Sequence, residues 1–236
     1  MATFNDDIFP EYYAQYRGQA QNIPAENSPE WLVARKLANS TIREWANQAD
    51  GTQWKELWTT LNTENPTTFD SSTTTYEIDG MQGLPGKITL IGSDGARHNF
   101  MVSEPYDALS ASETAPNIYF TGSTGNGFIL HIEGEMGEYD GFAIDFPYTK
   151  QPQMIEDGNS VPDMSDVDFM IQGMLARRFI QQRNGQGYNV AREAADRSLL
   201  NMKIRNNTGT YGNSSTIRDA SPGFGVRTSG RILGRG

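Results

Sequence analysis

The chain of 236 residues contains no cysteine and only two histidines. The absence of cysteine excludes disulfides and a thiol nucleophile, and it suits a reducing compartment. No apolar run approaches the roughly 18 residues that a membrane-spanning helix needs. The first residues, MATFNDDIFPEYY, lack the basic start and the apolar centre of a signal peptide. These absences predict a soluble protein without an export signal.

Basic residues are scarce until the last quarter of the chain. Residues 1–172 hold 8 Lys or Arg and 26 Asp or Glu, a net charge of −18, whereas residues 173–236 hold 11 and 3, a net charge of +8. Such asymmetry is typical of a chain whose basic segment binds an oppositely charged partner. That partner could be nucleic acid or the acidic body of a neighbouring copy.

The first quarter of the chain has helical patterns after an irregular start. Residues 1–27, rich in Asn, Gln and Pro, are interpreted as an arm with one helical turn. Ser28 and Pro29 then have the types expected at the cap and first position of a helix. Its buried stripe is predicted to contain Trp31, Ala34, Leu37, Ala38, Thr41 and Trp45. A second helix is predicted over TQWKELWTTLN, residues 52–62, because apolar side chains recur at Trp54, Leu57, Trp58 and Leu61.

From Pro66 to residue 151 the period of the pattern changes. Short segments rich in β-branched and aromatic residues alternate between apolar and polar positions, as strands with one buried face do. Glycine-rich turns such as GSDGA separate them. The pattern predicts an antiparallel module of about six strands. Its segments are TTTYEID, KITLI, RHNFMV, NIYFTG, GFILHIEG and GFAIDFPY.

After Pro152 the helical period returns. The stretch VPDMSDVDFMIQGMLARRFIQQR, residues 161–183, is predicted to be a helix that Ser165 and Asp168 start as a capping box. Its apolar face is predicted to contain Val167, Met170, Ile171, Met174, Leu175 and Phe179. GQG at 185–187 is expected to break it before a last helix, YNVAREAADRSLLNMKIRNN. The packing face of that helix is predicted to be Ala191, Ala194, Ala195, Ser198, Leu199 and Met202.

Residues 206–236 consist mostly of Gly, Ser, Thr, Asn and Arg. Such a segment cannot bury enough apolar surface to fold alone, so we expect a basic tail that orders only against a partner. The predicted fold class is therefore α+β. A helical bundle forms from the N-terminal (28–65) and C-terminal (152–205) helices, with an inserted antiparallel β module (66–151) and an extended C-terminal arm.

Carboxylates are the best catalytic candidates, because five lie close together in the sequence: Glu133, Glu135, Glu138, Asp140 and Asp145. A glycosidase needs two such groups in a cleft, one of them with a raised pKa, but a solvated strand and turn explain these acids more simply. His131 and Glu133 share a strand face that would permit a metal, yet no third ligand follows from the spacing.

Other catalytic motifs are incomplete. The glycines of TGSTGNG lack the GK[ST] ending of a phosphate loop, and no GxSxG elbow accompanies the two histidines. We therefore expect no enzymatic activity, cofactor or metal. The acidic body would repel a phosphate chain and no nucleic-acid reader motif occurs, so sequence-specific binding is not expected. Passive contact with DNA is compatible with the sequence.

Three stretches resemble the head-to-tail adaptor proteins of tailed bacteriophages, ring-forming subunits that dock beneath the portal. WLVARKLANSTIREWANQ followed by WKELWTTL is similar to the N-terminal helices of that family. YTKQPQMIEDGNSVPDMSDVDFMIQGMLARRF is similar to the family's return from the β module into the penultimate helix. GYNVAREAADRSLLNMKIRNN and the loose basic tail resemble its last helix and C-terminal arm.

The resemblance implies a structural virion protein made in the host cytoplasm and located at the neck of the virion. It implies a homo-oligomeric ring of about a dozen copies. Its partners would be the portal protein, tail or nozzle proteins and passing double-stranded DNA, with no membrane contact. Portal binding is expected from the tail through Arg205, Arg218, Phe224, Arg227, Arg231 and Arg235.

An acidic channel lining would let DNA slide during genome ejection, whereas a basic lining would hold it through phosphate contacts. The residues expected to face the channel are Glu133, Glu135, Glu138 and Asp140. Two alternatives stay open at this point. One is another neck or tail component, such as a stopper or nozzle subunit. The other is a peptidoglycan hydrolase that uses Glu133 with Glu135 or Asp140.

Overall fold

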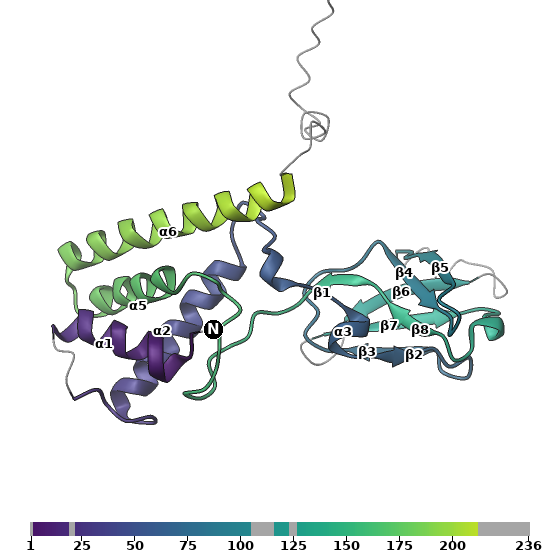
Figure 1. Ribbon diagram of the computed structural model, residues 1–236, viewed down its shortest axis with the longest axis horizontal. Helices are drawn as coiled ribbons and strands as arrows, with labels where there is room; N and C mark the ends of the chain where they lie inside the picture. The colour runs from purple at the N-terminus through teal and green to yellow at the C-terminus, as the bar shows by residue number, and fades with distance from the viewer. Residues whose placement is uncertain (1, 19–21, 105–115, 123–126, 212–236) are drawn as a thin grey trace, which may run out of the picture.

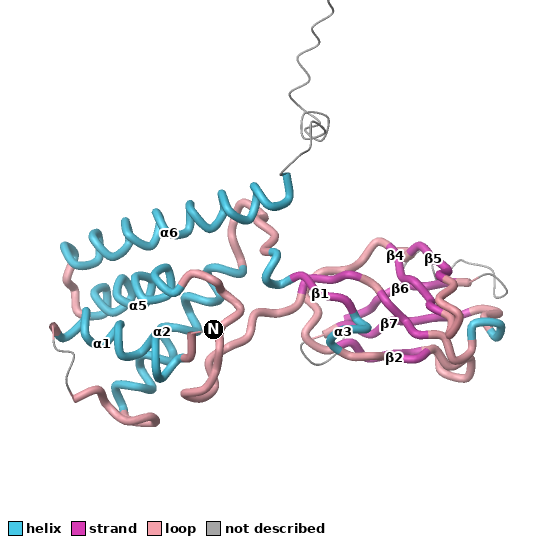
Figure 2. The backbone as a smooth tube through the Cα atoms, viewed as in Figure 1, coloured by secondary structure: helices cyan, strands magenta, loops and turns pink. Residues whose placement is uncertain are grey.

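The structure, a computed structural model, describes residues 2–18, 22–104, 116–122 and 127–211. The long helices gather at one end of the longest axis, and the strands, with short helical turns among them, gather at the other (Figure 1). Figure 2 shows the same arrangement coloured by secondary structure. All sheets are antiparallel. The α+β class predicted from the sequence is confirmed.

The N-terminal segment differs from the expected arm. A π-helix, η1 (Phe4–Ile8), continues directly into α1 (Phe9–Arg17). Phe4 and Ile8 are fully buried, and the Phe4 ring meets the Trp31 ring edge-on at 5.6 Å. The segment is polar in average composition, but its few aromatic residues lie at helical spacing and fill the core. It is therefore part of the helical core.

Helix α2 (Pro29–Ala46) begins where the sequence predicts. Ser28 Oγ accepts a hydrogen bond of 3.2 Å from the Trp31 amide, which satisfies one of the free amides of the first turn. Every residue of the predicted stripe is buried, and Ile42 joins it.

The helix predicted over residues 52–62 is wrong. The segment forms a short 3₁₀ helix, η2 (Lys55–Leu57), then strand β1 (Trp58–Thr60), then the single turn α3 (Leu61–Glu64). The apolar residues of this segment serve two different cores: Trp54 and Leu57 belong to the helical one, and Leu61 to that of the β module. Trp58 is 54% exposed. A single helix could not reach both cores, and the β-branched Thr59 and Thr60 suit a strand.

In the described parts of the β module, eight strands follow residue 66. One sheet has the order β2-β8-β4-β5 and a second has the order β3-β7-β6, while β9 pairs with β1. The alternation of buried and exposed residues predicted from the sequence is clearest in β3 and β4. The strands are β2 (Thr67–Thr68), β3 (Thr75–Ile78), β4 (Lys87–Ile91), β5 (Arg97–Met101), β6 (Asn117–Gly122), β7 (Phe128–Glu133), β8 (Ala143–Asp145) and β9 (Pro147–Thr149).

Two separate hydrophobic cores hold the chain together. The first contains side chains from η1, α1, α2, η2 and the two C-terminal helices, so both ends of the sequence contribute to it. The second lies within the β module and extends from Leu61 to Tyr148. Buried apolar surface is the main favourable term in folding, so each part has its own source of stability.

Helix α5 (Val167–Gln181) begins one residue later than its predicted capping box requires. Asp166, not Ser165, is the cap, because its Oδ1 accepts a 3.0 Å hydrogen bond from the Phe169 amide. The Ser165 hydroxyl instead donates to Glu56 Oε1 at 2.9 Å. The chain therefore uses Ser165 to tie the start of α5 to η2.

Helix α6 (Gly185–Tyr211) is longer at both ends than predicted. The glycines at 185 and 187, predicted to separate the last two helices, lie inside the first turn of α6. Asn184 caps this turn, since its Oδ1 accepts a 3.0 Å hydrogen bond from the Gly187 amide. The break falls just before, where Arg183 has a positive φ of 57°. The helix also continues through residues 206–211, which were assigned to the tail.

Candidate functional site

Among the predicted portal-binding residues, Arg205 alone lies in the described part of the chain. Its Nη2 is 2.7 Å from Asp166 Oδ2, and this carboxylate also accepts from the Ser198 hydroxyl at 2.7 Å. The next residue, Asn206, donates to the Gln53 carbonyl at 2.8 Å. Arg205 is therefore tied to the body of its own chain. The other predicted tail residues lie outside the described residues: Arg218, Phe224, Arg227, Arg231 and Arg235.

Much of the positive charge after residue 173 is paired within the chain. Among the residues that the structure describes there, five basic side chains make ion pairs with acids, four of them on α6. The pairs are Arg177–Glu44, Arg192–Glu44, Arg192–Asp196, Arg197–Glu193, Lys203–Asp50 and Arg205–Asp166. Fewer basic side chains of this segment are therefore free to bind a partner than the net charge of the sequence suggests.

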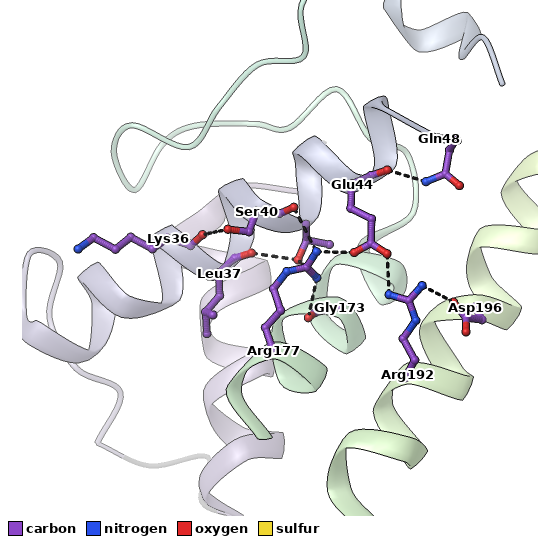
Figure 3. A network of polar contacts seen from close by, with 10 residues as sticks. Lys36, Leu37, Ser40, Glu44, Gln48, Gly173, Arg177, Arg192 and Asp196 are labelled. Atoms are coloured by element: carbon purple, nitrogen blue, oxygen red, sulfur yellow. Dashed lines mark hydrogen bonds and ion pairs between the residues drawn. The ribbon is translucent and has the colours of Figure 1, made fainter. Parts of the chain in front are cut away.

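The densest of these contacts is centred on Glu44 of α2 (Figure 3). Its carboxylate receives Arg177 from α5 on one oxygen and Arg192 from α6 on the other, the latter at 2.6 Å. Arg177 also donates to Thr41 Oγ1 and the Gly173 carbonyl, both at 3.1 Å. One carboxylate therefore joins three helices.

The electrostatics of this cluster follow from partial burial. Burial opposes the ionisation of Glu44, but hydrogen bonds from Arg192 and then Arg177 outweigh it and lower the pKa of the carboxyl below its usual range. Burial likewise disfavours the charged form of Arg192, and its hydrogen bond to Glu44 raises the pKa above the ordinary value. The cluster holds its charges fixed and mutually satisfied, so its role is to position helices.

Close approach of α2 and α5 makes the cluster possible. A Cβ atom on Gly173 would lie 2.6 Å from Thr41 Cγ2, which is too close for two carbon atoms. Glycine is therefore required at this crossing. The sequence contains Gly173 within an apolar helix, but its partner Thr41 lies far away along the chain.

The four predicted channel acids lie in one segment, residues 133–140, which joins the end of β7 to β8, and Figure 1 shows this segment at the end of the β module away from the helices. All four are exposed. Glu133 ends β7 and accepts from the Tyr119 hydroxyl at 2.8 Å, and Asp140 accepts from the Ser71 amide at 2.8 Å. Glu138 lies in the short helix η3 (Gly137–Tyr139).

Two further acids join this end through the sheet topology. Phe142 precedes β8; its carbonyl accepts from the Phe69 amide at 2.7 Å, and its ring faces Gly92 in the turn between β4 and β5. The chain therefore places Asp70 and Asp94 at the same end. We call the six residues the acidic tip: Asp70, Asp94, Glu133, Glu135, Glu138 and Asp140.

The acidic tip does not have the form of a glycosidase site. Such an enzyme keeps one carboxyl protonated by burial, whereas the acids named as catalytic candidates, Glu133, Glu135 and Asp140, are exposed. A hydrogen bond from Tyr139 to Glu138, aided by desolvation, raises the pKa of Tyr139.

His131 is engaged by its neighbours on the same sheet face. Its ring stacks on Tyr119 at 4.4 Å, and its Nε2 lies 2.8 Å from Thr121 Oγ1. Within the described ranges, no cluster of three or more histidines and acids is placed to bind a metal. No helix in the same ranges has the length and apolar character to cross a membrane.

No protein-family model matches the chain, and no curated protein matches it significantly.

Proposed function

We propose that the protein is a head-to-tail adaptor subunit of a tailed bacteriophage, a non-enzymatic virion protein that forms a ring of about a dozen copies beneath the portal. In this proposal the helices form a bundle, the β module is an insertion in it, and the C-terminal arm extends to the portal. The observation that carries the proposal is the arrangement of charge. An acidic tip lies at one end, and a basic segment leaves from the end of α6.

The acidic β module supports a channel-facing role. Residues 66–151 hold 12 acidic and 3 basic residues, a net charge of −9. Exposed acids repel DNA phosphates, so such a surface lets a duplex pass without binding it. We propose that Glu133, Glu135, Glu138 and Asp140 face the channel. Reversing these four charges is expected to slow genome ejection, and unchanged ejection kinetics would count against the role.

Helix α6 supports the role of the tail. Its buried face packs on the core through Ala191, Ala195, Leu199 and Met202. Near its end, Lys203, Arg205 and Asn206 bind the body of the chain. The helix therefore gives residues 212–236 a fixed point of departure. A basic segment that orders on contact can wrap a large surface of a partner.

Removing residues 212–236 tests the proposal while keeping all of α6. The truncated protein should keep the circular dichroism spectrum and melting temperature of the full chain but fail to form rings on purified portal, as seen by negative-stain electron microscopy. A full-length variant with Arg218, Arg227, Arg231 and Arg235 changed to Ser is the matched control for charge alone. Rings of the truncated protein on portals would refute the role of the tail.

The symmetry of the ring distinguishes an adaptor from other neck proteins. An adaptor should match the portal's twelvefold symmetry, whereas stopper and nozzle subunits often form sixfold rings. Class averages of the same micrographs therefore decide between these structural roles.

A further inference from the structure

A second feature lies at the end of the helical part opposite the acidic tip. Residues 169–192 contain four arginines and no acid, and residues 12–25 contain one charged residue, Arg17. Two of the four arginines, Arg177 and Arg192, bind Glu44. The other three arginines of these two segments, Arg17, Arg178 and Arg183, are not bound to Glu44, although the chain as a whole has a net charge of −10.

These three, Arg17, Arg178 and Arg183, define what we call the arginine end. The guanidinium carbons of Arg17 and Arg178 lie 4.9 Å and 5.1 Å from the centre of the Tyr16 ring, so both cations contact the same aromatic side chain. Arg183 follows at the end of α5. The ion pairs found among the described residues involve none of the three.

A groove of about 430 Å³ opens at the same end, between α1, α5 and the start of α6. Leu175, Phe179 and Ala191 contribute apolar surface, and the side chain of Val190, which is 65% exposed, lies at its edge. The polar part of the lining consists of the amide side chains of Gln15, Gln172, Asn184 and Gln186, and no charged side chain belongs to it. Each arginine of the arginine end is within two residues of a lining residue.

We propose that this groove binds an acidic peptide segment of a partner protein. An apolar side chain of the segment would enter the groove, and its flanking carboxylates would pair with Arg17, Arg178 and Arg183. Arginine favours carboxylates through planar, charge-assisted hydrogen bonds, and a central apolar anchor with charged flanks is a common design of peptide recognition.

Charge and shape favour an acidic peptide over the chain's own residues 212–236 and over DNA. The chain's own residues 212–236 carry four arginines and one acid, so the arginine end repels them. A DNA backbone would leave the apolar groove unfilled, and the strongly acidic body of the protein would repel it. A short acidic segment with an apolar anchor fills the groove and places its carboxylates beside the three arginines. The proposal concerns a contact separate from the tail and holds without the portal role.

Fluorescence anisotropy with a labelled peptide, Glu-Asp-Glu-Leu-Phe-Glu-Asp-Glu, tests the proposal on the full-length protein. We expect saturable binding at peptide concentrations up to about 1 mM, which weakens as salt is raised. A peptide with Lys in place of its acids, and one with Ser in place of Leu-Phe, should both bind at least about tenfold more weakly.

Variants of the protein locate the binding site. The double variant Arg178→Glu/Arg183→Glu should bind the acidic peptide at least about tenfold more weakly than the wild type. Val190→Glu, at the edge of the groove, should have the same effect. Arg197→Glu, an exposed change elsewhere on α6, is the matched control and should leave affinity unchanged. Circular dichroism of each variant verifies the fold.

Three results would overturn the proposal. The first is equal affinity for the acidic and basic peptides, or no binding of either. The second is tighter binding of a duplex DNA oligonucleotide at the same arginines. The third is self-association of the wild-type chain, measured by light scattering at low salt, that the Arg178→Glu and Arg183→Glu changes abolish, since a second copy would then fill the groove. None of these measurements uses the portal, so they leave the adaptor proposal untouched.

Discussion

Replacing Glu44 by Gln is expected to lower the free energy of unfolding of the helical part by about 2 kcal/mol. The change keeps the size and helix propensity of the side chain but removes the charge that Arg177 and Arg192 share. Both guanidinium groups would then remain partly buried against a neutral amide.

The magnitude follows from the burial of the three side chains. Exposed ion pairs contribute at most about 1 kcal/mol, and breaking a fully buried pair costs about 3–5 kcal/mol. The Glu44, Arg177 and Arg192 side chains are 26%, 24% and 36% exposed, so an intermediate value is expected. In a protein of this length, a loss of 2 kcal/mol lowers the melting temperature by about 4–8 °C.

Urea unfolding followed by tryptophan fluorescence measures the effect, because Trp31, Trp45 and Trp54 all lie in the helical core. The pH dependence provides a second check. Interactions in the folded state lower the pKa of Glu44 below 4.5, so its contribution is complete above that pH and is lost as the pH falls through the folded-state pKa. The difference between wild type and variant should therefore be constant near pH 7 and shrink below pH 4.5.

Glu193→Gln is the matched control. Glu193 pairs with Arg197 on the exposed face of α6, where the side chains are 66% and 75% exposed. This substitution should cost at most about 0.5 kcal/mol. If Glu44→Gln costs no more than Glu193→Gln, the shared charge of Glu44 does not stabilise the contact of the three helices.

Three further outcomes are expected. Gly173→Ala should destabilise the protein by about 1–3 kcal/mol in urea unfolding because the new Cβ would meet Thr41; no loss would show that the helices can separate freely. Trp54→Phe should cost about 2–3 kcal/mol in the same assay, since it removes the indole hydrogen bond of 2.6 Å to the Trp45 carbonyl. Burial raises the pKa of Tyr12 to about 12, so Tyr12→Phe should remove the last step of tyrosine ionisation seen by ultraviolet absorbance, and an unaltered last step would contradict the assignment.

The sequence predicts those elements whose determinants are local. Ser28 and Pro29 mark the start of α2, and the apolar spacing that follows identifies its buried face. Most strands of the β module are predicted for the same reason, because alternation and glycine turns act within a few residues. The segment GFAIDFPY, predicted as one strand, is divided between β8 and β9, and β2 is not predicted. The antiparallel pairing of β4 with β5 and of β6 with β7 follows from the short connections between these consecutive strands. The other pairs, such as β3 with β7, join strands that are distant in the sequence.

Elements that depend on distant contacts are not predictable in this way. Trp54, Trp58 and Leu61 have helical spacing, but the existence of two cores decides their structure. Residues 1–27 are predicted to be an arm because their high content of Asn and Gln outweighs the few aromatic residues that pack in the core.

The polar sites also divide into those formed by sequence neighbours and those formed by residues far apart in the sequence. Four acids of the acidic tip are neighbours in the sequence, whereas Asp70 and Asp94 reach it only through the order of the strands. Glu44 is separated from Arg177 by 133 residues and from Arg192 by 148, so no local pattern links them. The acid-free run at 169–192 was the available signal for the arginine end, and Arg17 could be added to it only in three dimensions.

The pairing of β1 with β9 has a consequence for how such a chain can change. The peptide leaves the helical part at Leu57 and returns at Lys150, whose amide donates to the Leu57 carbonyl at 2.8 Å. The two positions where the chain passes between the helical part and the β module thus lie side by side. A tight turn could therefore connect Leu57 directly to Lys150. Replacing residues 58–149 by such a turn is therefore expected to leave the helical core folded, because every buried residue of that core lies outside this range.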